Sequence, residues 1–413
     1  MTTGTLRLAT RGSDLALRQA AGVRDELSTR RRDVELVEVE TRGDRLDEDL
    51  ITELGRTGAF VRALDEEVLS GEVDAAVHSL KDMPTDMPDG LVVAAVGERA
   101  PAGDALVTRE GGDLADLPRG SVVGTSSLRR KAQVLAERPD LEVRPLRGNV
   151  DTRLQKLIAP ALQAEHERRV EAEADHKGDP GAREEDSEAR SASDSRATES
   201  SETAKPSRDD GSRDAASEPS RDREYERTVE EWFDDRTEFQ RAALEHEVDH
   251  EYDAIVLAEA GLRRSDLFYR DEYEVERLDR ADHVPAPGQG AVAVTASDPD
   301  VIDAIRSAMD HEPTRVATSV ERTILAELGG GCIAPIGVNA LVQGEHVSAR
   351  VRVLSADGDT EVKANRDLPL RTYREGAAEF AGSLRDQGAA ELIEAAKRAA
   401  DTETAKRVEE GDE

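Results

Sequence analysis

Short apolar strands alternate with amphipathic helices along this chain, and that alternation is the strongest constraint on its fold. Alternation of this kind predicts a largely parallel sheet with helices over its faces. The pattern restarts near residue 104, so we expect two such units. The predicted strands are 5–10, 34–41, 73–80, 90–97, 121–127, 141–149 and the start of 252–264, and the predicted helices are 13–30, 59–72, 128–138 and 150–158.

The C-terminal part follows a different pattern. Residues 314–328 predict a helix that ends at glycines, and residues 333–367 alternate like an antiparallel meander. Residues 373–400 predict a closing helix. This part is therefore expected to be a small α+β domain, and the chain shows no internal sequence repeat.

One internal stretch cannot build a core. From Glu171 to Glu224 there is no Val, Ile, Leu, Met, Phe, Tyr or Trp. Such a segment buries too little apolar surface to offset its ordering entropy, so disorder is predicted. Its C-terminal edge, 228–248, predicts a helix.

The charge is strongly negative, with 90 acidic and 56 basic residues and a net charge of −34. Residues 161–250 hold 28 acidic and 14 basic residues, a net −14, so −20 belongs to the rest of the chain. Nucleic acid is an unlikely partner because phosphate binding needs a basic face. The low content of aromatic residues and lysines resembles the composition of proteins from salt-accumulating haloarchaea. The alternative is an ordinary acidic bacterial protein.

We expect a cytoplasmic protein without a membrane span. No apolar run approaches about 18 residues, and the N-terminus has no apolar signal-peptide region. The single cysteine fits a reducing compartment.

Arginines gather at the junctions where predicted strands lead into helices. In open α/β sheets, ligands bind beyond the carboxyl ends of the strands, where helix N-termini add free N–H groups. Hydroxyl groups at the same junctions could donate hydrogen bonds. The pattern favours a cleft for a ligand with several carboxylates or phosphates; the alternative is that each arginine forms a surface ion pair. The residues concerned are Arg11, Arg129, Arg130, Arg147, Arg153, Arg263 and Arg264, with Ser13, Thr125, Ser126 and Ser127.

The stretch VDAAVHSLKDMP places polar residues at the end of an apolar strand. A carboxylate there, Asp82, could accept N–H bonds and stabilise a developing cation. The alternative is an aspartate that only caps a turn. His78 taken alone is more often structural.

The only cysteine, Cys332, directly follows three glycines. The glycines leave room beside the thiol, although a structural thiol remains the alternative. No phosphate-binding loop and no metal-ligand spacing of Cys and His occurs. The glycine-rich stretch APGQGA predicts a hinge or a tight crossover.

Together these stretches resemble hydroxymethylbilane synthase, also called porphobilinogen deaminase. The matching motifs are LRLATRGSDLALRQA, VETRGD, DAAVHSLKDMP, GTSSLRR, RPLRGNVDTRL, YDAIVLAEAGLRR, PAPGQGAV and GGGCIAPIG, and they follow the family's order over nearly the whole chain. The resemblance implies that four porphobilinogen molecules condense head to tail, with loss of ammonia, into hydroxymethylbilane. It also implies a dipyrromethane cofactor joined by a thioether to Cys332, and a catalytic role for Asp82 in stabilising the azafulvene cation.

The resemblance further implies two groups of binding residues, one for the cofactor and one for the carboxylates of the substrate. The implied cofactor-binding residues are Cys332, Ser79, Lys81, Thr125, Ser126, Ser127, Arg129 and Arg130. The implied substrate-binding residues are Arg11, Ser13, Gln19, Phe60, Arg147, Arg153, Arg264 and Gln289. No metal is implied, and a monomer is expected.

The implied fold is α/β, with two periplasmic-binding-protein-like α/β domains plus a small α+β C-terminal domain. The expected domains are 1–98 with 284–308, 99–283, and 309–413.

Two departures from the family stand out: Thr57 replaces the usual loop lysine, with Arg56 beside it, and an acidic insertion occupies about 159–248. The competing hypothesis is a non-catalytic two-domain protein that binds a polyanion.

Overall fold

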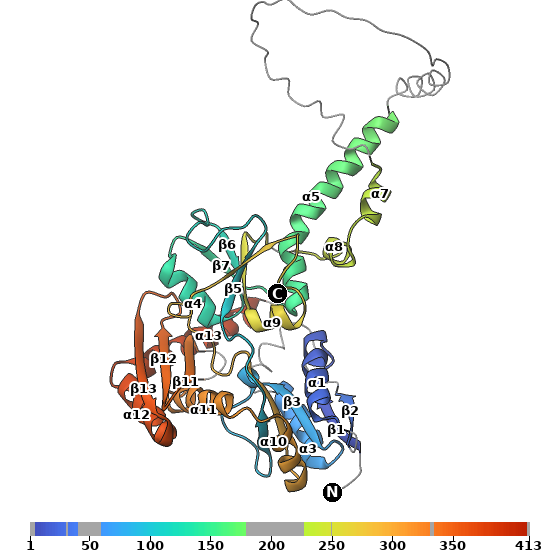
Figure 1. The fold of residues 1–413 in the computed structure, drawn as a ribbon. Coiled ribbons are helices and arrows are strands. Elements are labelled where there is room, and N and C mark those ends of the chain that lie inside the picture. The colour runs from blue at the N-terminus through green and yellow to red at the C-terminus, as the bar shows by residue number, and fades with distance from the viewer. Residues whose placement is uncertain are drawn as a thin grey trace, which may run out of the picture. The chain divides into compact units, whose positions relative to one another are not determined.

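The first of three sheets has five strands. A computed structural model describes residues 5–29, 32–39, 59–178, 227–248, 250–330 and 334–410. The strands are β1 (Thr5–Thr10), β2 (Asp33–Glu38), β3 (Ala75–Ser79), β4 (Val92–Val96) and β10 (Val292–Ala296), in the order β2-β1-β3-β10-β4 (Figure 1). Only β10 runs antiparallel to its neighbours β3 and β4.

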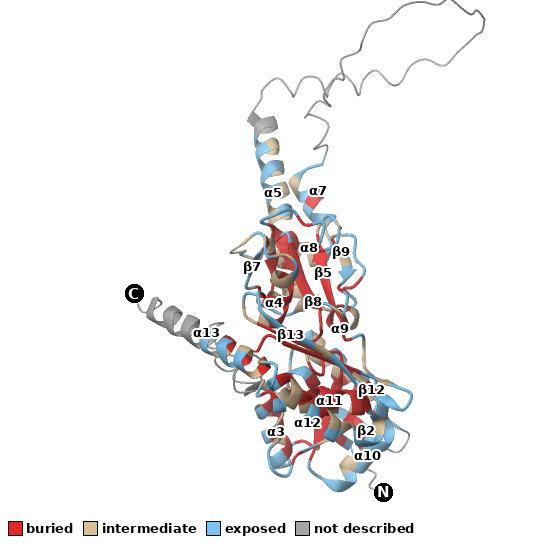
Figure 2. Ribbon diagram, turned by 90° about the vertical axis from the view of Figure 1, so that its left-hand side faces the viewer, coloured by how far each residue is buried: buried red, intermediate tan, exposed pale blue. Residues whose placement is uncertain are grey.

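Three helices cover the two faces of this sheet. Helices α1 (Asp14–Leu27) and α10 (Pro299–Met309) share a core cluster with sheet residues such as Leu8 and Val294. Helix α3 (Ala59–Ser70) packs on the other face, where Leu64 meets Ala76. Most residues of these strands are buried, and Figure 2 draws buried residues in red.

The second sheet repeats the topology of the first. Its strands are β5 (Asp104–Thr108), β6 (Val122–Gly124), β7 (Glu142–Arg144), β8 (Ala254–Ala258) and β9 (Glu274–Arg277), in the order β7-β6-β8-β5-β9. Here β5 is the strand antiparallel to its neighbours. The helices are α4 (Leu128–Glu137), α5 (Val150–Gly178) and α9 (Glu259–Arg264). In each sheet four of the five strands run in the same direction, so the prediction of two largely parallel sheets is confirmed; β5, β9 and α10 were not predicted.

The third sheet is the predicted antiparallel meander. It consists of β11 (Ile336–Gln343), β12 (His346–Leu354) and β13 (Glu361–Pro369). The domain also contains helices α11 (Glu312–Glu327), α12 (Tyr373–Arg385) and α13 (Ala389–Glu410). The single closing helix predicted over 373–400 is therefore two helices, α12 and α13. One core cluster joins all six elements. The fold is therefore α/β, with two α/β domains and a small C-terminal α+β domain.

Residues 158–248 form a separate compact unit. Helices α7 (Val229–Asp234) and α8 (Glu238–Leu244) each begin with a capping box, at Thr228 and Thr237. The buried Trp232 donates from its indole nitrogen to Glu165, at 2.9 Å. The predicted helical edge is thus confirmed, as two helices.

Two predictions about the insertion need correction. Disorder from Glu171 is wrong for 171–178, because α5 continues to Gly178. The helix expected to end at Ile158 also runs through Pro160. The segment 179–226, where disorder was predicted, lies outside the described residues.

Candidate active site

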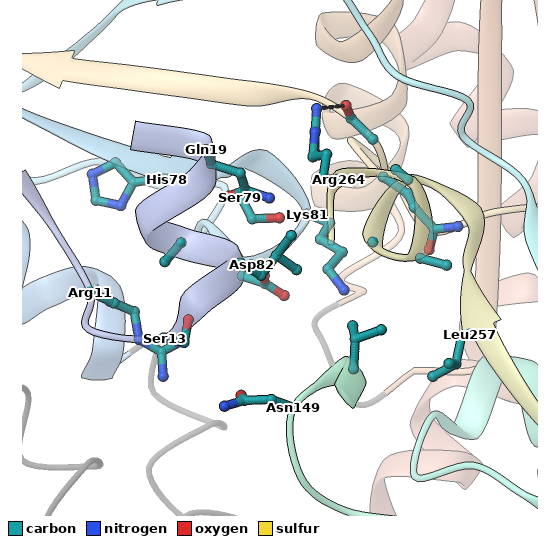
Figure 3. A pocket seen from close by; sticks show the side chains of 18 of the residues that line it. Arg11, Ser13, Gln19, His78, Ser79, Lys81, Asp82, Asn149, Leu257 and Arg264 are labelled. Atoms are coloured by element: carbon teal, nitrogen blue, oxygen red, sulfur yellow. Dashed lines mark hydrogen bonds between the residues drawn. The ribbon is translucent and has the colours of Figure 1, made fainter. Parts of the chain in front are cut away.

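A cavity of about 610 Å³ is lined by residues of both α/β domains (Figure 3). The first domain contributes the start of α1 and the end of β3, and the second contributes the starts of α5 and α9. Carboxyl ends of parallel strands meet at this edge of each sheet, as expected for a ligand site. The volume is in the usual range for a small-molecule pocket, roughly 300–1,000 Å³.

Asp82 and Lys81 lie on the cavity wall without side-chain partners in the described part of the chain. They belong to a 3₁₀ turn, η2 (Leu80–Asp82), which directly follows the buried strand β3. Both residues are exposed, and neither forms a hydrogen bond or an ion pair with any residue in the described part of the chain. Figure 3 shows both side chains at the cavity. Their charges are therefore available to a ligand.

Two arginines of the second domain also reach this cavity without an acidic partner among the described residues. Arg153 donates to the backbone oxygen of Gly148 (2.8 Å), and Arg264 donates to that of Gly290 (2.8 Å). Burial, together with the charge of Arg130, lowers the pKa of Arg153 to about 10. Burial also lowers the pKa of Arg264. Both remain cationic at neutral pH, and an acidic ligand would compensate their lost hydration.

Arg129 and Arg130 are in a different situation, because both are buried against Asp104. Asp104 accepts from Arg129 at 2.7 Å and from Arg130 at 2.9 Å. Burial would raise the pKa of Asp104, but the two guanidinium groups lower it below its usual value. Arg130 lines the cavity, and Arg129 instead binds the backbone oxygen of Val284 (2.9 Å). These are buried ion pairs and not the surface pairs considered from the sequence.

The remaining predicted residues divide into those on the wall and those behind it or outside the described chain. Those on the wall are Arg11, Ser13, Gln19, Ser79, Ser126 and Gln289. Thr125 is buried and accepts from the backbone of Ser127, which caps α4. Arg147 is described but does not line the cavity. Ser13 occupies the N-cap position of α1 without a side-chain capping bond.

Four predicted positions cannot be placed: Cys332, Arg56 and Thr57 lie outside the described residues, and so does the side chain of Phe60. The approach to Cys332 is nevertheless described. Helix α11 ends at Glu327, Gly329 follows with a φ of +65° that favours glycine, and Gly330 N–H donates to the oxygen of Leu325 (2.9 Å). This hydrogen-bond pattern terminates the helix as the glycines predicted.

Helix α11 also contacts both the segment that follows η2 and the crossovers between the α/β domains. The guanidinium group of Arg322 donates to the backbone oxygens of Met83 (3.1 Å) and Pro84 (2.5 Å), just after Asp82. The fully buried Glu321 pairs with Arg99 (2.7 Å) and accepts from Gly288 N–H (2.7 Å). The sequence interpretation missed Asp104 and Glu321, because nothing in their local sequence indicates their partners.

The donor set of the cavity fits a cofactor with several carboxylates. Lys81, Arg153 and Arg264 bring positive charge without acidic partners among the described residues, and Asp82 offers an acceptor for N–H groups. A dipyrromethane has both features: acetate and propionate groups on pyrrole rings with N–H donors. Among the described residues, no group of His, Cys, Asp and Glu could hold a metal ion. No described helix is long and apolar enough to cross a membrane.

Comparison with known proteins gives matches over most of the chain. Residues 6–166 and 240–302 match the family model of the porphobilinogen deaminase dipyromethane cofactor binding domain, and 316–377 match that of the porphobilinogen deaminase C-terminal domain. A probable porphobilinogen deaminase of Halobacterium salinarum is 53% identical over 96% of this chain and 99% of the relative. The porphobilinogen deaminase of Campylobacter hominis is 30% identical over 96% and 99%.

The chain is also weakly similar to solved structures of solute-binding proteins. The apo ectoine-binding protein TeaA of a TRAP transporter is 11% identical, with a TM-score of 0.32 over 96% of this chain and 98% of that one. The assignment therefore depends on the family models and the relatives. On these matches, the chain belongs to the porphobilinogen deaminase family.

Proposed function

We propose that this chain is a hydroxymethylbilane synthase, a transferase that condenses four porphobilinogen molecules head to tail and releases ammonia. The observation that carries the proposal is the pairing, in one cavity, of a partnerless Asp82 with cations that lack acidic partners among the described residues. The cations suit the carboxylates of porphobilinogen, and arginines can grip carboxylates with two parallel hydrogen bonds. Family membership supports catalysis over the competing hypothesis of a polyanion-binding protein.

Asp82 is the proposed catalytic residue. It accepts hydrogen bonds from pyrrole N–H groups and stabilises the positive charge that develops when the C–N bond breaks and ammonia leaves with the electron pair. The neighbouring pyrrole carbon then forms the new C–C bond and loses its proton. A fixed carboxylate at the developing cation lowers the barrier because it needs no reorganisation during the step.

The other wall residues are proposed to bind and orient. Arg11, Arg153, Arg264 and Lys81 hold acetate and propionate groups, and Ser13, Ser79 and Ser126 add hydroxyl donors. Arg130 lies on the wall, and Arg129, paired with Asp104 behind it, fixes the position of α4. Bound dipyrromethane supplies a covalent primer on which the chain of pyrroles grows, with Cys332 proposed as its attachment point.

We also propose the three-domain division at 1–98 with 284–308, 99–283, and 309–413. Sheet membership supports it, because β10 lies in 284–308 and pairs with β3 and β4 of the first sheet. The enzyme is further proposed to be a cytoplasmic, halophilic monomer. The dispersed acidity supports the halophilic character, since concentrated salt screens self-repulsion.

Cofactor loading tests the function directly. The purified wild-type protein is expected to turn pink with Ehrlich's reagent, to carry a two-pyrrole mass adduct and to convert porphobilinogen. Cys332→Ser removes the thiol that would form the thioether, so its intact mass should lack the adduct. An adduct that persists on the serine variant would refute the attachment point. A wild type with neither adduct nor turnover would refute the function.

A further inference from the structure

Three buried polar side chains meet in the layer between α3 and the first sheet. The Nε2 atom of His78 on β3 lies 2.9 Å from Oγ1 of Thr295 on β10 and 3.2 Å from Oδ1 of Asp65 on α3. The Thr295 hydroxyl donates to the same Asp65 oxygen, at 3.2 Å. The three atoms form a closed triangle, and all three residues are at least 96% buried, with exposures of 4%, 0% and 2%.

Packing alone does not account for this triangle. Its surroundings are apolar, with Leu64 and Val68 of α3 facing Ala76 of β3. The second carboxylate oxygen of Asp65 is buried and has no hydrogen-bond partner among the described residues. An unsatisfied buried oxygen costs free energy, about 1–3 kcal/mol, that apolar side chains of similar shape would not. A group retained at such a cost needs another explanation.

The position of His78 indicates what that explanation is. His78 is the only triangle member on the cavity wall, and it precedes Asp82 by four residues in the segment from β3 into η2. Figure 3 shows its imidazole apart from the Asp82 carboxylate. Asp82 itself has no hydrogen bond to any residue in the described part. The placement of its carboxylate therefore depends on where the backbone of the turn lies.

We propose that His78 is a positioning residue: the Asp65–His78–Thr295 triangle locks the end of β3, so that η2 presents Asp82 to the pyrrole N–H groups in one orientation. The inference rests on the proposed function. Backbone hydrogen bonds between β3 and the segment of β10 also fix the end of β3, because His78 pairs with Ala293 and Leu80 N–H donates to the oxygen of Ala291 (3.0 Å). The triangle adds a side-chain restraint from a third element, α3.

The chemistry of the triangle predicts which substitutions preserve it. Thr295 donates its only proton to Asp65, so His78 Nε2 must supply an N–H donor to the triangle. A glutamine amide carries such a donor and does not titrate. His78→Gln should therefore keep the lock, His78→Leu should break it, and Thr295→Val should remove the central hydroxyl.

The test compares kcat and KM of cofactor-loaded variants well below their melting temperatures. His78→Leu should lower kcat about tenfold or more, since misplacement by about 1 Å can cost a hundredfold. KM should stay within about twofold, because the cations of the wall are untouched. Thr295→Val should show a smaller loss of the same kind, and His78→Gln should recover most of the wild-type kcat.

Tyr273→Phe is the matched control for Thr295→Val. It also deletes a buried hydroxyl, which donates to the oxygen of Leu267 (2.6 Å) in the second domain, away from the cavity wall. It should lower the melting temperature with kcat unchanged. The inference is overturned if Thr295→Val and His78→Leu keep wild-type kcat, or if His78→Gln is as impaired as His78→Leu. If His78→Leu fails to fold, the comparison of kcat between Thr295→Val and Tyr273→Phe still tests the inference. A wild type without turnover would refute the function and this role with it, whereas an active wild type with unimpaired His78→Leu and Thr295→Val variants would refute the role alone.

Discussion

The two α/β domains share a topology, yet the acids at equivalent strand ends differ. Strands β3 and β8 occupy the same place in their sheets, and each leads directly into a short helical segment with an acid. After β3, Asp82 is exposed and has no partner among the described residues. After β8, Glu259 is 5% exposed and accepts from Arg263 (2.8 Å) and Arg277 (2.9 Å).

The difference shows how one architecture yields one acid without a partner among the described residues and one acid neutralised by arginines. The fold brings both to the same edge of a sheet, but arginines neutralise only one of them. Asp104 on β5 resembles Glu259 in this respect, because two arginines of its own domain bind it. In the second domain, arginines therefore neutralise the acids at this edge of the sheet, and Arg153 and Arg264 remain available to a ligand. In the first domain, the acid Asp82 remains available to it.

Removing the acid at the most deeply buried pair should have the largest effect. Asp104→Asn would leave Arg129 and Arg130 buried without their counter-charge, which should lower the free energy of unfolding by about 3–5 kcal/mol. Denaturant unfolding measures this loss. Asp25→Asn is the control, because Asp25 pairs with Arg24 on the surface and should lose less than about 1 kcal/mol.

The same pair predicts a direction with pH. Because folding lowers the pKa of Asp104, its contribution is present above the ordinary value of 3.8 and is lost as the pH falls below that value. Wild type and Asp104→Asn should therefore converge in stability on acidification. A stability difference of equal size at pH 7 and in strong acid would contradict the role of this charge.

Asp82→Asn should have the next largest effect, on rate and not on stability. The amide keeps the shape but removes the negative charge beside the developing cation. Electrostatic stabilisation of this kind is often worth about 3–4 kcal/mol, so kcat should fall by about two to three orders of magnitude. Single-turnover measurements on loaded enzyme would show it.

Asp86→Asn controls for a charge change nearby, because Asp86 is exposed close to Asp82 in sequence and does not line the cavity. Its turnover should equal that of the wild type. Near-normal turnover of Asp82→Asn would mean that another group stabilises the cation.

Glu259→Gln should have the opposite effects to Asp82→Asn, with lower stability and nearly unchanged turnover. It removes the carboxylate shared by Arg263 and Arg277, whose side chains are 33% and 56% exposed. Solvent can hydrate both arginines afterwards, so the expected cost is smaller, about 1–3 kcal/mol of unfolding free energy. Turnover at a temperature where the variant is folded should stay close to wild type. A large kcat loss with unchanged stability would show that the β8 acid is not merely structural.

The sequence predicts the two strands and the acids after them, but not which of these acids is neutralised. Periodicity located β3, β8 and the polar residues after them, because strand alternation and apolar runs are local signals. It could not tell which charges are neutralised, because the partners lie far along the chain. Asp104 is 25 residues from Arg129, Glu321 is 222 from Arg99, and Thr295 is 217 from His78. The short strand β9 was missed because its four residues are mostly polar and exposed.

One element of the second domain has no counterpart in the first. Helix α5 lies between β7 and β8 as α3 lies between β2 and β3, but α5 has 29 residues against 12, and most of it belongs to the insertion. The family model skips residues 167–239, so the matched domain does not require them. Within 158–248, Gln163 donates to the oxygens of Leu244 (3.2 Å) and His246 (2.8 Å). The two ends of the insertion are thus bound to each other.

Deleting the insertion should have the smallest effect and would make the two domains alike. Replacing about 161–248 with a short glycine-containing turn shortens a loop, which changes its closure entropy by only about 0.6 kcal/mol per doubling of length. The cavity residues all lie outside 158–248, so the Ehrlich colour and kcat should be unchanged. The removed residues carry a net charge near −14, so the salt dependence of stability and the solubility should change instead. A variant that folds and loads its cofactor but loses turnover would show that the insertion takes part in the reaction cycle, and that the second domain differs from the first in function as well as in length.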